Sequence, residues 1–236
     1  MPLLTRNNLK LLKSDTVGYV SYGIHLAPHK QGGKNLCPNA SPGCIAGCLN
    51  GAGYGCYQRT RNARINKTHY FNNDKPAFIS QTKQEILSKI KKSKDGVLSF
   101  RLNLTSDVHW EKIKTEGKNL MEHFPDVQFY DYTKNETRML KFLSGDFPNN
   151  YHLVFSKSEI NLEECKNVLS RGGQVAVVFK DKLPKKYLGK RVVDGTQHDM
   201  VFLQPKNCVI GLVALGPGKK DKSGFVVKKG NNQYSK

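Results

Sequence analysis

The segment Val175-Ala-Val-Val-Phe179 contains no polar residue. A strand that is apolar at every position fits a sheet whose two faces are both covered. Other short β-rich runs lie at 97–102, 127–132, 152–155 and 209–215, with helix-compatible or irregular connections between them. This succession predicts an α/β fold with a largely parallel sheet. We interpret it as an incomplete (β/α) barrel, with an open sheet as the alternative.

The first third of the chain is predicted to lead into this sheet. Residues 16–24 (TVGYVSYGI) are expected to form a strand, and residues 58–71 a helix with a basic face. A second helix is expected to begin at Asp74, because Asp caps helices and Pro76 suits the first turn. We expect a single α/β domain over residues 1–215, including a cysteine-rich loop at 36–57. Residues 216–236 are expected to form a basic, mobile tail, with 225–227 as a candidate edge strand.

The charge balance indicates the kind of partner to expect. The chain has 38 Lys and Arg against 19 Asp and Glu, a formal net charge of +19 at pH 7 and a sequence pI of about 9.7. Such an excess favours polyanionic partners, nucleic acid first and an acidic membrane second. Most of the excess is Lys spread along the chain, so a solubility role is the alternative. Hydrophobic residues make up 38% of the chain, which excludes wholesale disorder.

The sequence shows no targeting or membrane segment. The first residues, MPLLTRNNLKLLKSD, lack an apolar run followed by small residues, and no stretch of about 18 apolar residues occurs. We therefore expect a cytoplasmic protein without a membrane span. In a reducing compartment, clustered cysteines indicate metal or redox chemistry rather than structural disulfides.

Polar residues follow the ends of the predicted strands, where parallel α/β folds place their functional crevice. Three carboxylates, Asp107, Asp131 and Asp194, are candidates to orient a substrate or transfer protons. The candidate substrate-binding residues are Arg101, Asn103, Ser106, Trp110, Tyr132, Lys134, Ser156, Lys180 and His198. Each carboxylate taken singly could instead cap a helix or close an Asx turn, and Trp110 could pack in the core. The recurrence at successive strand ends nevertheless predicts one concave polar site, in which Arg101, Lys134 and Lys180 would hold phosphate.

Four cysteines lie within one Gly- and Pro-rich stretch, at Cys37, Cys44, Cys48 and Cys56. Their spacing lacks the CxxC pairs that typify zinc ribbons and thioredoxin-like sites. We therefore expect Cys37, Cys44 and Cys48 to ligate three irons of a [4Fe–4S] cluster, with Cys56 or another group on the fourth iron. A zinc ion held by four thiolates is the alternative. The remaining two cysteines, Cys165 and Cys208, are expected to be buried thiols.

Seven blocks of sequence together suggest a family. They are CPNASPGCIAGCL from residue 37, ARINKT from 63, RLNLTSDVHWE from 101, FPDVQFYDYTK from 124, NYHLVFSKSE from 150, VAVVFK from 175 and VVDGTQHD from 192. On these blocks the chain resembles the phage "gene product 88" domain family over roughly residues 18–227. The resemblance implies a phage protein in the host cytoplasm and specifies no activity.

The layout of the cysteine loop and strand ends is also distantly similar to the partial barrels of radical-SAM enzymes. That similarity implies a [4Fe–4S] cluster at the mouth of the barrel, and S-adenosylmethionine as a cofactor. The usual CxxxCxxC motif of those enzymes is absent here, which argues against S-adenosylmethionine binding.

Three functions are consistent with these patterns. The first is an iron–sulfur protein with a polar pocket beside the cluster, carrying out redox or radical chemistry on a nucleotide or nucleic acid. The second is a non-catalytic nucleic-acid-binding protein whose loop is held by zinc. The third is a nuclease with Asp107, Asp131, Asp194 and Asp199 as Mg²⁺ ligands.

Overall fold

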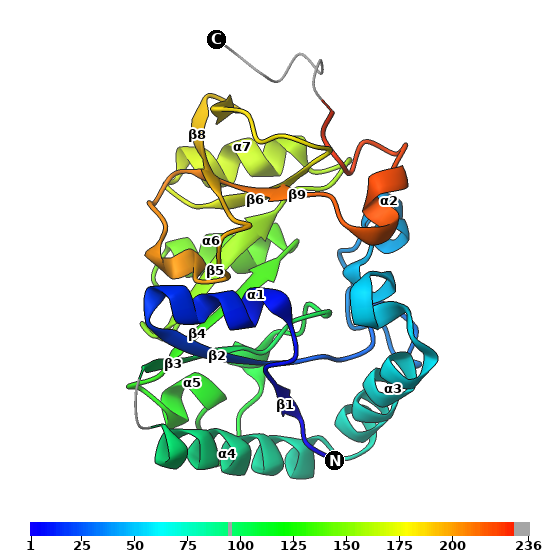
Figure 1. The fold of residues 1–236 in the computed structure, drawn as a ribbon. Coiled ribbons are helices and arrows are strands. Elements are labelled where there is room, and N and C mark those ends of the chain that lie inside the picture. Colours follow the sequence, from blue (N-terminus) through cyan, green and yellow to red (C-terminus); the bar gives the residue numbers. More distant parts are fainter. Residues whose placement is uncertain (94–95, 229–236) are drawn as a thin grey trace. The chain divides into compact units, whose positions relative to one another are not determined.

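The computed structural model describes residues 1–93 and 96–228 (Figure 1). Its strands are β1 (Leu4–Thr5), β2 (Tyr19–Ile24), β3 (Val97–Arg101), β4 (Gln128–Thr133), β5 (Tyr151–Ser156), β6 (Val175–Phe179), β7 (Lys186–Tyr187), β8 (Lys190–Asp194) and β9 (Val209–Val213). Its α-helices are α1 (Leu9–Leu12), α2 (Pro42–Ala46), α3 (Gln58–Asn73), α4 (Lys75–Lys92), α5 (Leu120–His123), α6 (Glu136–Leu143) and α7 (Leu162–Ser170). Short 3-10 helices follow the cysteines and the last strand, at η2 (Leu49–Gly51), η3 (Gly53–Cys56) and η6 (Gly216–Lys220).

The strands hydrogen-bond in the order β1-β2-β3-β4-β5-β6-β9-β8-β7. The pairs β2–β3, β3–β4, β5–β6, β6–β9 and β8–β9 are parallel, whereas the short outer strands β1 and β7 pair antiparallel. The predicted α/β fold with a largely parallel sheet is therefore confirmed. Across the residues that the structure describes, the order runs from β1 to β7 without closing, so the sheet is not a closed barrel.

By its internal contacts the chain divides into two compact units, which are described separately below. The first unit comprises Met1–Pro38, Tyr57–Asp131 and Phe147–His152, and the second comprises Asn39–Cys56, Tyr132–Asp146 and Leu153–Lys236. The boundaries fall inside β4 and β5, so each of these strands contributes residues to both units. The single domain expected over 1–215 stays a prediction, because compact units of this kind occur within domains as well as between them.

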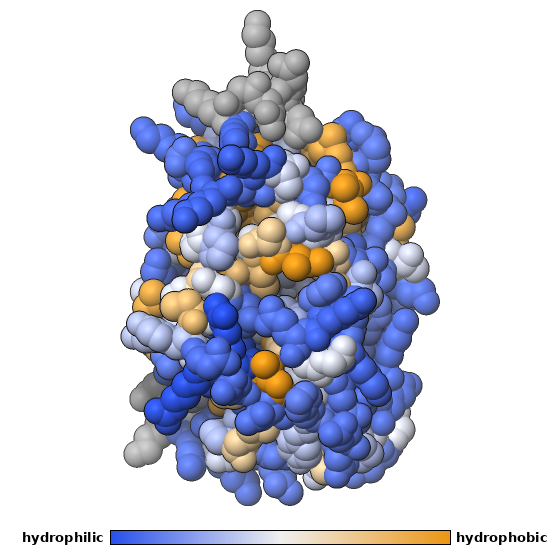
Figure 2. All heavy atoms as spheres, turned by 90° about the vertical axis from the view of Figure 1, so that its right-hand side faces the viewer, coloured by the Kyte–Doolittle hydropathy of each residue, from blue (hydrophilic) through white to orange (hydrophobic). Residues whose placement is uncertain are grey.

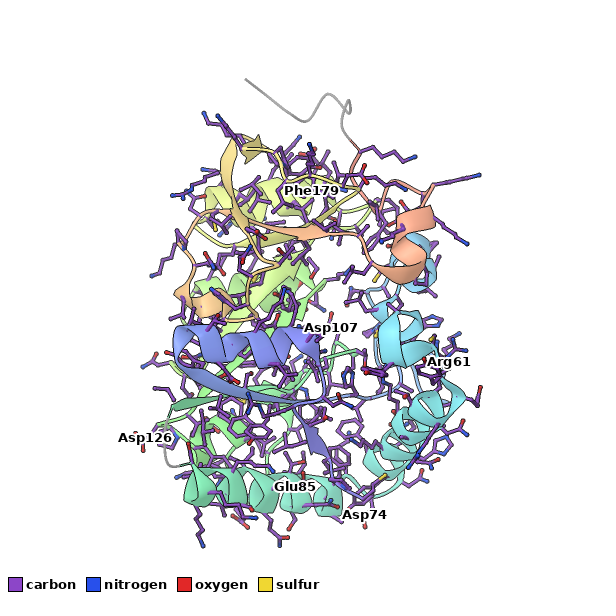
Figure 3. The ribbon with its side chains drawn as sticks, in the orientation of Figure 1. Arg61, Asp74, Glu85, Asp107, Asp126 and Phe179 are labelled. Atoms are coloured by element: carbon purple, nitrogen blue, oxygen red, sulfur yellow. The ribbon has the colours of Figure 1, made fainter. Side chains whose placement is uncertain are left out.

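An aromatic cluster between α3, α4 and the loop after β3 forms part of the first unit's core. Trp110 is fully buried, with its ring 5.5 Å from that of Phe71 and 6.4 Å from that of Phe78. The predicted start of α4 is confirmed, since the Asp74 side chain accepts a hydrogen bond from the Ala77 amide at 3.0 Å. Figure 3 shows Asp74 at this end of α4, and Glu85 further along the same helix.

The second unit builds its core on β6 and β9, which pair along their full length from Val175↔Val209 to Phe179↔Val213. Four of the five residues of β6 are buried, as the uninterrupted apolar run predicted. Helix α7 packs Cys165, Val168 and Leu169 into this core. Both Cys165 and Cys208 are buried, as expected, and burial raises the pKa of the Cys165 thiol to about 12.

Residues 216–228, named here the C-terminal strap, belong to the second unit's fold. The Val227 amide donates to the Val178 carbonyl at 2.8 Å, and the Lys180 amide donates to the Val227 carbonyl at 2.9 Å. Val226 and Val227 are buried, which explains why this stretch is fixed although its flanks are polar. The mobile tail expected at 216–236 therefore does not begin before residue 229, and 229–236 lie outside the described residues.

Candidate functional site

Residues 39–56 of the cysteine loop belong to the second unit, where one carboxylate accepts hydrogen bonds from them. Glu159, three residues beyond β5, accepts hydrogen bonds from the Ser41 hydroxyl at 2.7 Å and from the Gly43 amide at 2.6 Å. The Ser41 oxygen in turn accepts from the Cys44 amide at 3.2 Å and caps α2. Burial would raise the pKa of the Glu159 carboxyl, but the hydrogen bonds from Ser41, its own amide and Gly43 outweigh it, and the pKa is lowered.

The C-terminal strap also holds this loop. A Cβ atom added to Gly43 would lie 2.7 Å from Cβ of Phe225 and would collide with the Ser223 side chain. One added to Gly216 would lie 2.5 Å from Ala52. Only glycine permits these close approaches, so the loop and the strap fit together through backbone contact. The loop is thereby fixed at the carboxyl ends of β5, β6 and β9.

Two cysteines of the loop, Cys44 and Cys48, lie four positions apart in sequence. Cys44 is on α2, which ends at Ala46, and Cys48 caps η2 while its amide donates to the Ile45 carbonyl. Both thiols are half-buried, and the Asn50 amide donates to Sγ of Cys48 at 3.5 Å. Cys56, at the end of η3, is exposed. None of the six cysteines forms a disulfide.

Two predicted cations of the second unit contact the C-terminal strap. The Lys134 ammonium lies 5.6 Å from the centre of the Phe225 ring, and that of Lys180 donates to the Lys219 carbonyl. Ser156 is half-buried at the end of β5, where its carbonyl accepts from Asn161. These three residues therefore lie on the same side of the second unit as the cysteine loop.

The other predicted residues of the second unit make local contacts. Asp194, exposed at the end of β8, accepts from the amide and hydroxyl of Thr196 and from the side chain of Gln197. This is the Asx turn that the sequence left open as an alternative. The His198 ring accepts from the Met200 amide at 3.2 Å, and Tyr132 is half-buried. Asp199, a ligand in the nuclease hypothesis, is fully buried.

Lys157 and Glu159 belong to the polar series predicted after the third strand, now β5, but only Ser156 of that run was chosen as a site residue. Lys157 is buried, and its ammonium donates to the carbonyls of Ser158 and Gly224. Burial lowers the pKa of this ammonium, although Cys165, Glu159 and Asp221 oppose the shift. Charged residues are seldom buried unless they have partners, and the available signal was the run Ser-Lys-Ser-Glu directly after an apolar strand.

In the first unit, Asp131 organises the loop that follows β3. Its fully buried carboxylate accepts from the backbone amide of Asn103 at 2.7 Å, from the side chain of Asn103 at 3.1 Å and from the Tyr151 hydroxyl at 2.8 Å. The side-chain oxygen of Asn103 then accepts from Ser106, from the Val108 amide and from the indole of Trp110. Predicted site residues are thus joined in one network, in which Asp131, Asn103 and Trp110 are buried and support the loop.

Cys37 lies against the same loop after β3. The Cys37 thiol points to the Thr105 carbonyl at 3.8 Å, and the Asp107 amide donates to the Leu36 carbonyl at 2.8 Å. Asp107 itself is half-buried (Figure 3). In this unit the predicted cysteine and the predicted strand-end residues therefore lie next to each other.

His25, which directly follows β2, is the most perturbed titratable group near this loop. Burial lowers the pKa of its imidazole well below the ordinary value, and the positive charges of Arg64, Lys67 and Arg101 lower it further. The folded protein therefore holds His25 neutral at pH values where the unfolded chain is protonated.

This linkage predicts an acid-sensitive fold. Because the folded pKa of His25 is depressed, its contribution is fully present above the unfolded pKa of about 6.5 and is lost as the pH falls below it. We expect the unfolding free energy to drop between pH 7 and pH 5, by at most about 1.4 kcal/mol per pH unit from this residue. Urea unfolding of the wild type and of His25→Gln across this range measures the effect. A variant with the same pH dependence as the wild type contradicts it.

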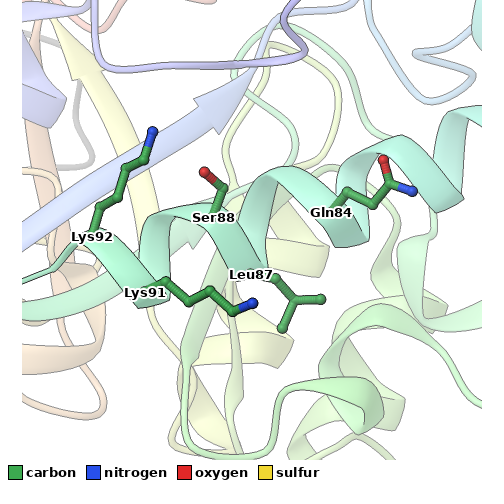
Figure 4. A pocket seen from close by; sticks show the side chains of 5 residues that line it. All are labelled: Gln84, Leu87, Ser88, Lys91 and Lys92. Atoms are coloured by element: carbon green, nitrogen blue, oxygen red, sulfur yellow. The ribbon is translucent and has the colours of Figure 1, made fainter.

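No group of three or more His, Cys, Asp or Glu side chains in residues 1–93 and 96–228 is arranged to hold a metal ion. A shallow hollow of about 320 Å³ lies on α4, lined by Gln84, Leu87, Ser88, Lys91 and Lys92 (Figure 4). It contains none of the predicted site residues. Over the same described ranges, no helix is long and apolar enough to cross a membrane.

A comparison with models of protein families identifies the family of the chain. The family model described as Gene product 88 matches residues 2–229, which is nearly the whole sequence. The chain belongs to the phage Gene product 88 family. The match includes the cysteine loop, the loop after β3 and the C-terminal strap, so all the elements described above lie within the region of the Gene product 88 model. Searches of curated proteins and of solved structures found no match.

Proposed function

We propose that this Gene product 88 protein binds a [4Fe–4S] cluster through its cysteine loop and acts in the host cytoplasm on a phosphate-bearing substrate, a nucleotide or nucleic acid. Cys44 and Cys48 would be ligands from the second unit. The sequence spacing adds Cys37 as the third ligand, and leaves the fourth iron to Cys56 or to an external group.

The observation that carries the proposal is the way the cysteine loop is built. Glu159 and the C-terminal strap fix the loop at the carboxyl ends of three parallel strands, where α/β proteins bind ligands. A loop needed only as a connection would not require a buried lysine, a bidentate carboxylate and glycine-only contacts. Cys44 and Cys48 form no disulfide and lie four positions apart, which suits metal ligands, and the Asn50 amide supplies the kind of N–H···S contact that tunes a cluster.

The surrounding residues suit an anionic substrate. When bound, a [4Fe–4S] cluster supplies one-electron chemistry or an open iron for substrate binding. Lys134 and Lys180 contact the C-terminal strap that packs on the loop, and they would attract phosphate by charge. The formal net charge of +19 favours a polyanionic partner. Hydrophilic side chains predominate on the face drawn in Figure 2.

Metal and sulfide analysis of protein purified without oxygen tests the proposal. We expect a brown protein with about four iron and four sulfide per chain. The double variant Cys44→Ser/Cys48→Ser should lose most of the iron and the colour while its circular dichroism stays unchanged. Cys208→Ala is the matched control, because it removes a thiol outside the loop, and it should keep the iron.

A colourless protein with one zinc per chain would overturn the iron–sulfur assignment. It would support instead a non-catalytic nucleic-acid-binding protein with a zinc-held loop, which the net charge also favours. Iron retained by the double variant would show that these two cysteines are not ligands.

A further inference from the structure

Helix α3 of the first unit is fixed along one side by buried residues. Arg64, Thr68 and Phe71 are the buried residues of this helix. The Thr68 hydroxyl accepts from the Ala27 amide at 2.8 Å and donates to the Arg64 carbonyl at 2.9 Å. The Phe71 ring lies 5.5 Å from that of Trp110. These contacts set the orientation of α3, and with it the side that faces the solvent.

The exposed side of α3 is polar and basic. Its residues recur every three or four positions, as one face of a helix requires: Arg59, Asn62, Ala63, Asn66, His69 and Asn73. At 1.5 Å per residue this stripe is about 21 Å long. Tyr57, the N-cap residue of the helix, is 61% exposed.

A loop that packs on α3 adds two exposed lysines, Lys30 and Lys34. Gly32 lies between them and is buried against the helix, where its carbonyl accepts from the Asn72 side chain at 3.4 Å. A Cβ atom added to Gly32 would collide with the methyl group of Thr68, so only glycine permits this approach. The two lysines, the exposed stripe of α3 and Tyr57 are named here the α3 surface.

The α3 surface comes from a part of the chain that has no acidic residue. Residues 16–73 include no Asp or Glu. Among the helices of eight residues or more in the described ranges, α4, α6 and α7 each include a Glu, whereas α3 has none. Helix faces that serve only solubility usually mix both signs, because Glu–Lys pairs one turn apart stabilise a helix. Arg59 even lies in the first turn, where the helix macrodipole disfavours a cation.

We propose that the α3 surface binds the sugar-phosphate backbone of a nucleic acid. Its cations attract phosphates, its asparagine side chains donate hydrogen bonds to phosphate oxygens, and Tyr57 offers a ring on which a base can stack. A stripe of about 21 Å matches about six phosphates along one strand of B-form DNA, so the partner is a polymer rather than a nucleotide. The surface is formed by the first unit, so it stands independently of the metal content of the cysteine loop.

Fluorescence anisotropy with a labelled oligonucleotide of about 20 nucleotides tests the α3 surface in the full-length protein. We expect Lys34→Gln/Arg59→Gln to bind at least about fivefold more weakly than the wild type at about 50 mM salt, and the slope of log affinity against log salt to fall by about 2. Lys91→Gln/Lys92→Gln is the matched control, because it removes the same charge from exposed positions of the same unit. It should bind within about twofold of the wild type.

Single-stranded DNA, duplex DNA and RNA of equal length identify the polymer, and binding of any of them through Lys34 and Arg59 supports the surface. Equal weakening by the two double variants would show an effect of overall charge and overturn it. Displacement of the oligonucleotide by polyglutamate at the same charge concentration would also overturn it, since that result indicates an acidic protein partner.

A pair of substitutions at one exposed position provides a second test that does not remove any charge of the wild type. Asn66→Lys should tighten binding and Asn66→Glu should weaken it, each by about threefold, because the two changes have opposite sign at the centre of the stripe. Equal affinities of these two variants would contradict the proposal. Cys44→Ser/Cys48→Ser should bind the oligonucleotide like the wild type, so a failure of the cluster assignment and a failure of this surface give different results.

Discussion

Asp131→Ala is expected to lower the unfolding free energy by about 3–5 kcal/mol, as removal of a hydrogen-bonded buried charge does. The carboxylate of Asp131 is fully buried and accepts three hydrogen bonds, from the amide and side chain of Asn103 and from Tyr151. Alanine would leave these three donors in the interior without an acceptor. Urea unfolding followed by circular dichroism measures the loss as a lower midpoint.

Two further variants provide reference values for the loss of stability in Asp131→Ala. Tyr151→Phe removes one of the three donors together with its need for an acceptor, so we expect a loss of only about 1 kcal/mol. Asp126→Ala changes an exposed carboxylate of the same unit (Figure 3) and should alter stability by less than about 0.5 kcal/mol. If Asp131→Ala lies as close to the wild type as Asp126→Ala does, the network does not support the loop after β3.

Glu159→Ala is expected to release the cysteine loop from the second unit. The Ser41 hydroxyl and the Gly43 amide would both lose their acceptor, at a combined cost of about 1–3 kcal/mol after allowance for the partial exposure of Glu159. Hydrogen exchange should quicken at the amides of residues 43–48, while the amides of β6 stay protected.

A carboxylate nearby provides the control for this experiment. Glu163 lies four residues after Glu159, on the first turn of α7. It is exposed and pairs with Lys166. Glu163→Ala should leave hydrogen exchange in the loop unchanged. Equal exchange rates at residues 43–48 in Glu159→Ala and the wild type would mean that the strap alone fixes the loop.

The sheet could be predicted because a strand that is covered on both faces is apolar at nearly every position. Val175–Phe179 is apolar throughout since both of its faces are covered, and α4 begins at Asp74 because capping uses residues that are neighbours in sequence. The site was harder to predict. Glu159 contacts Gly43 across 116 positions, and Arg64 reaches the segment of His25 through Thr68. Such contacts follow from the packing of elements, and no local pattern encodes them.

Strand-end reasoning chooses polar residues by their position and says nothing of what each of them contacts in the fold. Asn103 and Asp131 were chosen as groups for a substrate, yet they hydrogen-bond to each other, to the backbone and to the side chains of the same network. A carboxylate that shapes a loop and one that faces a ligand look alike in a sequence. They differ in burial, which depends on the residues that cover them.

The C-terminal strap sets an order of events during synthesis. Val227 bonds to β6, and Phe225 packs on the loop around Gly43, so the ribosome must complete more than 180 further residues before that loop receives its cover. Until then the carboxyl-terminal part of β6 and the loop around Gly43 lack the contacts of the strap. Under the function proposed above, the cluster would load most easily in this interval, and arrival of the strap would then hold the loaded loop in place.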